Sequence, residues 1–201
     1  MTTRLIILTL FCLGIPSFTQ AQTNKYSLDK CARTYYSDSN TETPEQKQAA
    51  LRECIIGKQF PAFSATTITE KKYSDADLKG KVVFVTSWFA TCPPCIAEMP
   101  MLNELSKKYK DKNFLLLSFS ADDVERINKF QKERPITYEI FPNSEGMIIH
   151  EMQTSYGFPT NIIVGKNGEI VEFKTGSPTD EKGLETVKND FIAIIERELA
   201  K

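Results

Sequence analysis

Two cysteines separated by two residues follow an apolar, β-branched segment directly, and this arrangement constrains the fold more than any other feature of the chain. Residues 81–88 (KVVFVTSW) are almost continuously apolar, which is typical of a strand buried on both faces of a sheet. Cys92-Pro-Pro-Cys95 comes next, and apolar side chains then recur at helical spacing up to Tyr109. The pattern predicts a strand, a short turn that carries both cysteines, and a long helix.

The remainder of the chain alternates between strand and helix patterns. Residues 114–120 predict a second buried strand, 123–133 a second helix, 137–141 a short strand, and 151–156 a brief helix. The Asn167-Gly168 pair predicts a hairpin between 161–164 and 169–173, and 180–199 are amphipathic. This order predicts an α/β fold in which helices flank a mixed central sheet.

The N-terminus has the composition of an export signal. Arg4 is followed by an apolar run over residues 5–15 and by a small-residue exit at Ala21. The run is too short to span a bilayer, so we predict a signal peptide over residues 1–21, whose cleavage removes Cys12 from the mature protein. A buried N-terminal helix or strand is the alternative. No other apolar run approaches spanning length, so the mature protein is expected to have no membrane span. Export allows disulfides to form and persist.

Residues 22–57 predict a short N-terminal helical appendage that precedes the main domain at 58–201. Thr43-Pro-Glu-Gln46 has the pattern of a helix start with a capping box, and Gly57 is placed to end that helix. Cys31 and Cys54 lie on either side of a turn-rich loop, without close cysteine neighbours. They predict a structural disulfide worth about 3 kcal/mol. Two unpaired thiols are the alternative.

Charge and histidine content exclude several classes of function. The formal net charge of −1 gives no basic surface for nucleic acid. The only histidine is His150, which rules out metal sites with two imidazoles and leaves little room for a Ser-His-Asp or Cys-His arrangement. Zinc would require a second close cysteine pair. We therefore expect no metal at Cys92 and Cys95, although a zinc pair and an inert disulfide remain as alternatives.

The Cys92–Cys95 pair has the spacing of a redox-active dithiol. A cysteine at a helix N-terminus is stabilised as a thiolate by the helix dipole and free N–H groups, which makes Cys92 the candidate nucleophile and Cys95 the resolving thiol. Pro94 has no N–H to offer the Cys92 sulfur, so the Cys95 amide is the chief donor. Fewer donors favour the disulfide form and predict a reductant.

The motif Trp88-Phe-Ala-Thr-Cys-Pro-Pro-Cys-Ile-Ala-Glu-Met-Pro100, with Gly157-Phe-Pro-Thr160 downstream, resembles the exported thioredoxin-fold disulfide reductases of the TlpA/ResA type, which are related to AhpC/TSA proteins. The resemblance covers roughly residues 57–199. It implies a thioredoxin fold, a periplasmic location and no cofactor beyond the redox-active disulfide. It further implies disulfide-containing proteins as substrates, a membrane thiol-relay protein as electron donor, and service in cytochrome c maturation or general disulfide reduction.

The resemblance also implies roles for individual residues. Glu98 would move thiol protons, where the alternative is an exposed first-turn carboxylate. Pro159 would be cis and lie beside the disulfide, where the alternative is an ordinary proline at a strand entry. Five residues would contact substrate: Trp88, Thr91, Pro93, Phe158 and Pro159. Many relatives have tryptophan at the position of Thr91, so the partner preference does not transfer.

Two other functions remain as alternatives. A thiol peroxidase is disfavoured because that chemistry uses a threonine and an arginine around the attacking sulfur. A non-catalytic copper carrier would use His150, but the carriers it resembles space their cysteines by three residues. Disulfide reduction assayed beside metal titration separates a disulfide reductase from a metal carrier.

Overall fold

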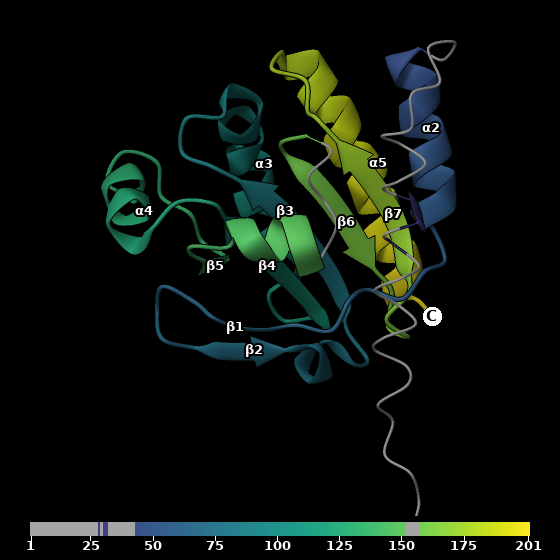
Figure 1. The fold of residues 1–201 in the computed structure, drawn as a ribbon, viewed down its shortest axis with the longest axis horizontal. Helices are drawn as coiled ribbons and strands as arrows, with labels where there is room; N and C mark the ends of the chain where they lie inside the picture. The colour runs from purple at the N-terminus through teal and green to yellow at the C-terminus, as the bar shows by residue number, and fades with distance from the viewer. Residues whose placement is uncertain (1–27, 29, 32–42, 152–156) are drawn as a thin grey trace, which may run out of the picture.

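A five-stranded sheet forms the centre of the molecule, in a computed structural model that describes residues 28, 30, 31, 43–151 and 157–201 (Figure 1). The strand order is β5-β4-β3-β6-β7. The strands are Val82–Trp88 (β3), Phe114–Ser120 (β4), Glu139–Phe141 (β5), Thr160–Val164 (β6) and Ile170–Thr175 (β7). β3 is parallel to β4, and β4 to β5, whereas β6 is antiparallel to both β3 and β7. The prediction of a mixed α/β sheet is therefore confirmed.

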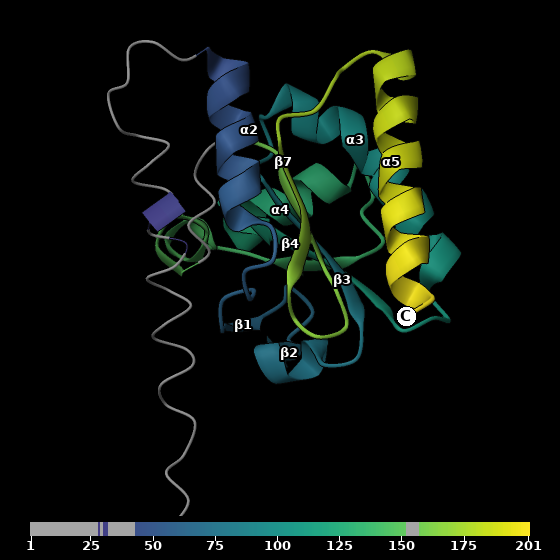
Figure 2. The same ribbon diagram turned by 90° about the vertical axis from the view of Figure 1, so that its right-hand side faces the viewer.

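The central strand β3 has cores on both of its faces, because all seven of its residues are buried. Val82 and Phe84 pack against helices α3 (Pro93–Tyr109) and α5 (Glu181–Leu199), which lie side by side over one face of the sheet (Figures 1 and 2). Phe84 and Phe191 of α5 meet edge to face with centroids 5.0 Å apart. These contacts hold α3 against the sheet, and they thereby position its N-terminus, where Cys92 and Cys95 lie.

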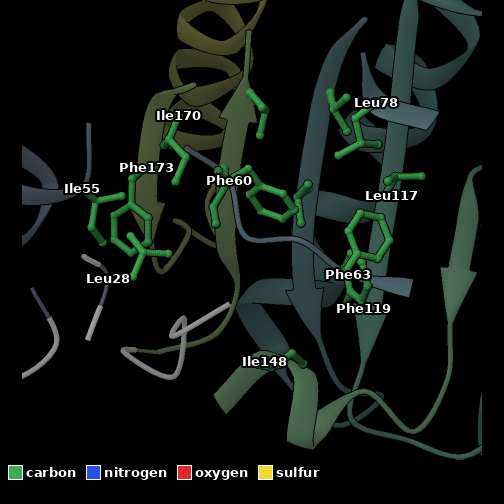
Figure 3. Close-up of a cluster of buried hydrophobic side chains, with 14 of the residues drawn as sticks. Leu28, Ile55, Phe60, Phe63, Leu78, Leu117, Phe119, Ile148, Ile170 and Phe173 are labelled. Carbon is green, nitrogen blue, oxygen red and sulfur yellow. The ribbon is translucent and has the colours of Figure 1, made fainter. Parts of the chain in front are cut away.

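The opposite face of the sheet is covered by several short elements rather than by two long helices. Val83 and Val85 of β3 belong to this second core, which Figure 3 shows in part. Phe63, in the segment before β1 (Ser64–Thr66), makes edge-to-face contacts with Phe119 and Phe141. The remaining large members of this core include Leu28, Leu51, Ile55, Phe60, Tyr73, Ile148 and Phe173.

Helix α2 (Pro44–Ile55) packs along the edge strand β7 (Figure 2). Its first turn has the predicted capping box, in which Thr43 accepts from the Gln46 amide and the Gln46 side chain accepts from the Thr43 amide. Arg52 donates twice to the Glu172 carboxylate, each time at 2.7 Å. Since Leu51 of α2 shares the core of the sheet, the segment predicted as an appendage packs directly on the main domain.

Other parts of the chain differ from the sequence prediction. A small hairpin of β1 and β2 (Lys72–Ser74), followed by a 3-10 turn over Asp75–Leu78, was not predicted. Where a brief helix was expected over 151–156, the structure has a π-helical turn over Met147–Glu151, and 152–156 lie outside the described residues. The predicted signal peptide over 1–21 also lies outside them. No helix within the described ranges has the length and apolar character needed to cross a membrane.

Candidate active site

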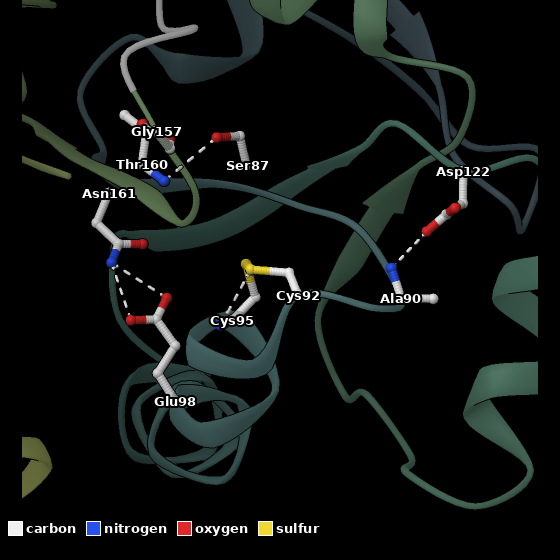
Figure 4. The surroundings of a disulfide bond; sticks show 9 residues. All are labelled: Ser87, Ala90, Cys92, Cys95, Glu98, Asp122, Gly157, Thr160 and Asn161. Carbon is white, nitrogen blue, oxygen red and sulfur yellow. Dashed lines mark hydrogen bonds between the residues drawn. A yellow bond between two sulfur atoms is a disulfide. The ribbon is translucent and has the colours of Figure 1, made fainter. Parts of the chain in front are cut away.

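Cys92 and Cys95 lie where β3 leads into α3, at one end of the sheet (Figure 4). Cys92 is the N-cap of α3, with extended backbone, and Pro93 and Pro94 occupy the first helical positions. The two sulfurs form a disulfide of 2.01 Å with a Cα–Cα distance of 5.3 Å. The Cys95 amide donates to the Cys92 sulfur over 3.3 Å, and no other residue of the described ranges makes a hydrogen bond to that sulfur. This agrees with the sequence prediction that Cys95 is the chief donor.

The disulfide is embedded in an apolar cluster, with only its flanks at the surface. Cys92 is 3% exposed and Cys95 is 1% exposed. The cluster also contains Trp88, Met99, Ile127, Phe130 and Ile140, with Ile127 and Phe130 supplied by helix α4 (Val124–Gln131). Thr91 and Pro93 are exposed, so they are the residues next to the sulfurs that a docking protein would meet first. Trp88 is buried beneath the site and is not at this surface, contrary to its predicted contact with substrate.

A second loop reaches the same end of the sheet from β6. The Phe158–Pro159 peptide bond is cis, Pro159 is buried, and β6 begins at the next residue. Thr160 anchors the loop, since its amide donates to Ser87 Oγ over 3.3 Å and its hydroxyl donates to the Gly157 carbonyl over 2.6 Å (Figure 4). The cis geometry implied by the resemblance is therefore present.

A hollow with both apolar and charged walls opens beside the two loops. Phe158 meets Phe89, from the loop after β3, edge to face with centroids 5.2 Å apart. Both rings line a cavity of about 380 Å³ together with Thr91, the residue before Cys92. The remaining walls are Ala121, Ile148 and Ile149 and the charged residues Asp122, Arg126 and Glu145.

The loop that leads to Cys92 is held by an acidic residue that the sequence analysis did not select. Asp122 accepts a hydrogen bond of 2.5 Å from the Ala90 amide (Figure 4). It also pairs with Arg126 at 3.1 Å. The Asp122 side chain is only 10% exposed. Its position directly after a predicted strand, at the edge where the cysteine loop also leaves the sheet, was the available signal in the sequence.

Glu98 lies on α3 three residues after Cys95 and is 1% exposed, so the alternative of an exposed first-turn carboxylate is wrong. Both carboxylate oxygens accept from Asn161 Nδ2, each at 3.1 Å (Figure 4). Burial raises the pKa of Glu98 from 4.5 to about 7, although Asn161, the Ser177 hydroxyl and the Lys174 charge oppose the shift. Ser177 is near the carboxyl, but its geometry falls short of a hydrogen bond. The protonation of Glu98 therefore changes near neutral pH, as proton transfer requires.

Cys31 and Cys54 form a second disulfide, as the sequence predicted. The S–S distance is 2.02 Å and the Cα–Cα distance is 5.7 Å. Cys31 is 1% exposed and belongs to the core that α2 shares with the sheet, whereas Cys92 and Cys95 belong to a different apolar cluster. The two disulfides are thus parts of separate cores.

Within the described ranges, no group of three or more His, Cys, Asp or Glu side chains is arranged to hold a metal ion. The side chain of His150 lies outside what the structure describes.

Residues 56–173 match the model of the AhpC/TSA family. The chain belongs to the AhpC/TSA family. It is 35% identical over 128 residues to the thiol-disulfide oxidoreductase ResA of Bacillus cereus, a match that covers 63% of this chain and 73% of the relative. It is 31% identical over 144 residues to the thioredoxin-like protein YneN of Bacillus subtilis, covering 70% of this chain and 82% of the relative.

Solved structures agree on the fold of this AhpC/TSA family member. A putative thiol:disulfide interchange protein DsbE from Chlorobium tepidum superposes with a TM-score of 0.61 at 22% identity, covering 70% of this chain and 97% of that one. At that identity the likeness shows the fold alone. The chain therefore has a thioredoxin fold, and by its similarity to the ResA proteins it is a thiol-disulfide oxidoreductase.

Proposed function

We propose that this thiol-disulfide oxidoreductase acts in the periplasm as a reductant of protein disulfides. The observation that carries the proposal is the Cys92–Cys95 pair at the N-terminus of α3, with the buried carboxyl of Glu98 one turn further along the same helix. Cys92 is the attacking thiolate, Cys95 the resolving thiol and Glu98 the proton acceptor. No cofactor beyond the cysteine pair is needed for this exchange.

The exchange moves two electrons from the enzyme to its substrate, and the protons are exchanged with solvent. The Cys92 thiolate attacks one substrate sulfur, so a mixed disulfide forms while the other substrate sulfur leaves as a thiolate and takes up a proton. Cys95 then passes its proton to the Glu98 carboxylate and attacks the Cys92 sulfur. The Cys92–Cys95 disulfide forms, and the second substrate sulfur leaves as a thiolate that is protonated in turn. Glu98 finally releases its proton to solvent.

The direction of the reaction follows from the donors around the Cys92 sulfur. Pro93 and Pro94 have no N–H groups, and the Cys95 amide gives the one recorded hydrogen bond to that sulfur. Poor stabilisation of the thiolate favours the disulfide form of the enzyme, which makes its dithiol form a good electron donor.

The substrate would bind across the two loops at the end of the sheet. Phe158 and Pro159 would present backbone for pairing with an extended substrate segment, and the exposed Thr91 and Pro93 would contact its surface. The cavity beside Phe158 would take a side chain of the substrate between its aromatic and its charged walls. Trp88 would support the site from below, since it is buried.

The cellular setting rests on the sequence and on the relatives. The apolar run over 5–15 supports export with removal of residues 1–21, and a buried Cys31–Cys54 disulfide suits an oxidising compartment. After each turnover a membrane thiol-relay protein would reduce Cys92–Cys95 again. Similarity to the thiol-disulfide oxidoreductase ResA supports a role in disulfide reduction, and the TlpA/ResA-type motif would extend that role to cytochrome c maturation.

Reduction of insulin with a dithiol as electron donor tests the activity. We expect turnover by the natural protein and none by a Cys92→Ser variant, with the same samples titrated with copper and assayed for hydroperoxide consumption. Copper binding or peroxide turnover without insulin reduction would refute the proposal. In the exporting cell, a Cys95→Ser variant should accumulate mixed disulfides whose partners identify the substrates. A Cys92→Ser/Cys95→Ser double variant is the matched control and should trap none.

A further inference from the structure

Asn161 is an unusual residue for its place in the fold. It is the second residue of β6, all five residues of which are buried, and it is itself 1% exposed. Asparagine is depleted in strands, and a buried amide destabilises the fold unless its polar atoms are hydrogen-bonded. The remaining buried residues around it on β3 and β6 are mostly apolar, so packing alone does not explain an amide here.

The amide of Asn161 is directed at Glu98. Its Nδ2 donates to both carboxylate oxygens at 3.1 Å, which joins β6 to α3 across 63 residues of sequence (Figure 4). The Oδ1 atom of the same amide is buried and has no hydrogen-bond partner in the described part of the chain. Thr86, directly opposite Asn161 on β3, likewise has a buried hydroxyl without a described partner. The Nδ2 group of the amide is therefore hydrogen-bonded, whereas its Oδ1 atom is an acceptor without a donor among the described residues.

Other elements also bring titratable groups near Glu98. Lys174, opposite Asn161 on β7, places a positive charge that favours the carboxylate. Tyr138, just before β5, is near enough that burial and the charge of Glu98 together raise the pKa of its phenol above the usual range, so Tyr138 stays neutral. Cys95 is one helical turn away on α3 itself. Among these neighbours, Asn161 makes the hydrogen bonds recorded for the Glu98 carboxyl.

We propose that Asn161 is the positioning residue of the redox reaction, which holds the Glu98 carboxyl near Cys95 and gives it a hydrogen-bond partner in both of its protonation states. The ionised carboxylate accepts from Nδ2, as the structure shows. When the carboxylate takes the Cys95 proton, it becomes a donor, and half a turn of the amide presents Oδ1 to accept from it. No bond to Asn161 is made or broken.

This role of Asn161 rests on the proposed role of Glu98, and it predicts a measurable rise in the pKa of Glu98 when the amide is removed. Without the amide, the ionised carboxylate loses its donor, so the pKa of Glu98 should rise. Loss of a hydrogen bond to a charged group corresponds to a rise of about one to two units. From a starting value of about 7, the ionised fraction at neutral pH would fall by roughly five- to fifty-fold.

Two Asn161 variants and one matched control test this. Asn161→Leu removes the amide, and the nearly isosteric Asn161→Asp replaces the donor with a second carboxyl, which should raise the pKa of Glu98 as well. Ile163→Val is the control, because Ile163 lies two residues along the same face of β6 and packs in the core rather than on Glu98. Each oxidised protein is titrated by carboxyl NMR with labelled glutamate, Glu98 being assigned with Glu98→Gln, and insulin reduction is measured against pH.

We expect both Asn161 variants to move the Glu98 titration and the acidic limb of the activity profile to higher pH, with Ile163→Val unchanged. Asn161→Leu in a Glu98→Gln background should move the profile no further. If Glu98→Gln alters the profile but both Asn161 variants titrate like the natural protein, the role of Asn161 is overturned. If the Asn161 variants shift the titration while Glu98→Gln leaves the profile unchanged, the proposed role of Glu98 fails, and with it the role of Asn161 in turnover.

Discussion

Replacement of Glu98 by glutamine should change how the free energy of unfolding of the oxidised protein depends on pH. Glu98 is 1% exposed, and its pKa is raised from 4.5 to about 7 mainly by burial. A raised pKa means that the fold favours the neutral carboxyl. Its contribution to stability is fully present below about pH 4.5 and is lost as the pH rises toward 7, because the unfolded chain ionises first.

The magnitude follows from the size of the shift. At roughly 1.4 kcal/mol per pKa unit, a rise from 4.5 to about 7 removes about 3 kcal/mol of stability between pH 4 and pH 8. Glutamine has nearly the same shape and does not ionise, so Glu98→Gln should escape this loss. The difference in free energy of unfolding between variant and natural protein should therefore change by about 3 kcal/mol, in favour of the variant, over that range.

Urea denaturation at a series of pH values, with both disulfides closed, provides the measurement. The difference between the two proteins is the useful quantity, because carboxyls such as Asp77 and Glu196, whose pKa values are lowered, contribute a pH dependence of opposite sign to both curves. A difference that stays constant from pH 4 to pH 8 would refute the reasoning, since it would mean that Glu98 ionises equally easily in the folded and unfolded chains.

Three further predictions concern the cysteines and the substrate loop. The reduction potential of Cys92–Cys95, measured by equilibration with glutathione, should lie nearer −270 mV than −120 mV, the approximate values of thioredoxin and DsbA; a value at the oxidising end would contradict the donor argument. A Cys31→Ala/Cys54→Ala variant should lose about 3 kcal/mol of stability in urea with an unchanged active-site potential, and an unchanged stability would refute a structural role. Phe158→Ala should raise KM for insulin while leaving the reduction of a small disulfide unaffected; equal loss on both substrates would show that the ring serves only the fold.

The sequence predicted the elements whose pattern is long and regular. β3, β4 and α5 are apolar or amphipathic over several residues, and the Asn167-Gly168 turn marks the β6–β7 hairpin, so each was recognisable locally. β1 and β2 were not, because each has only three residues, which is too short for an alternating pattern to be recognised. Their position depends on contacts with distant residues, such as that of Phe63 with Phe141.

The candidate site shows the same division between local and distant information. Cys92, Cys95 and Glu98 lie within one motif on α3, where helical spacing places them on a common side. Asn161 and Asp122 are 63 and 32 residues from the groups they bind, and no local pattern joins them. The sequence did contain one sign in the case of Asn161, which is an amide directly before the apolar run Ile162–Val164.

The two disulfides impose opposite redox demands on one chain. The Cys31–Cys54 bond must be inserted once by an oxidant, whereas Cys92–Cys95 must be reopened by a reductant in every cycle. Burial does not separate the two bonds, because Cys92 and Cys95 are as buried as Cys31, and Cys54 is only partly buried. What separates them is their place in the fold: Cys31 and Cys54 pack in one core, and Cys92 and Cys95 in another. A partner that docks on the exposed Thr91 and Pro93 to reduce Cys92–Cys95 is therefore expected to leave Cys31–Cys54 closed, because that bond belongs to a different part of the fold.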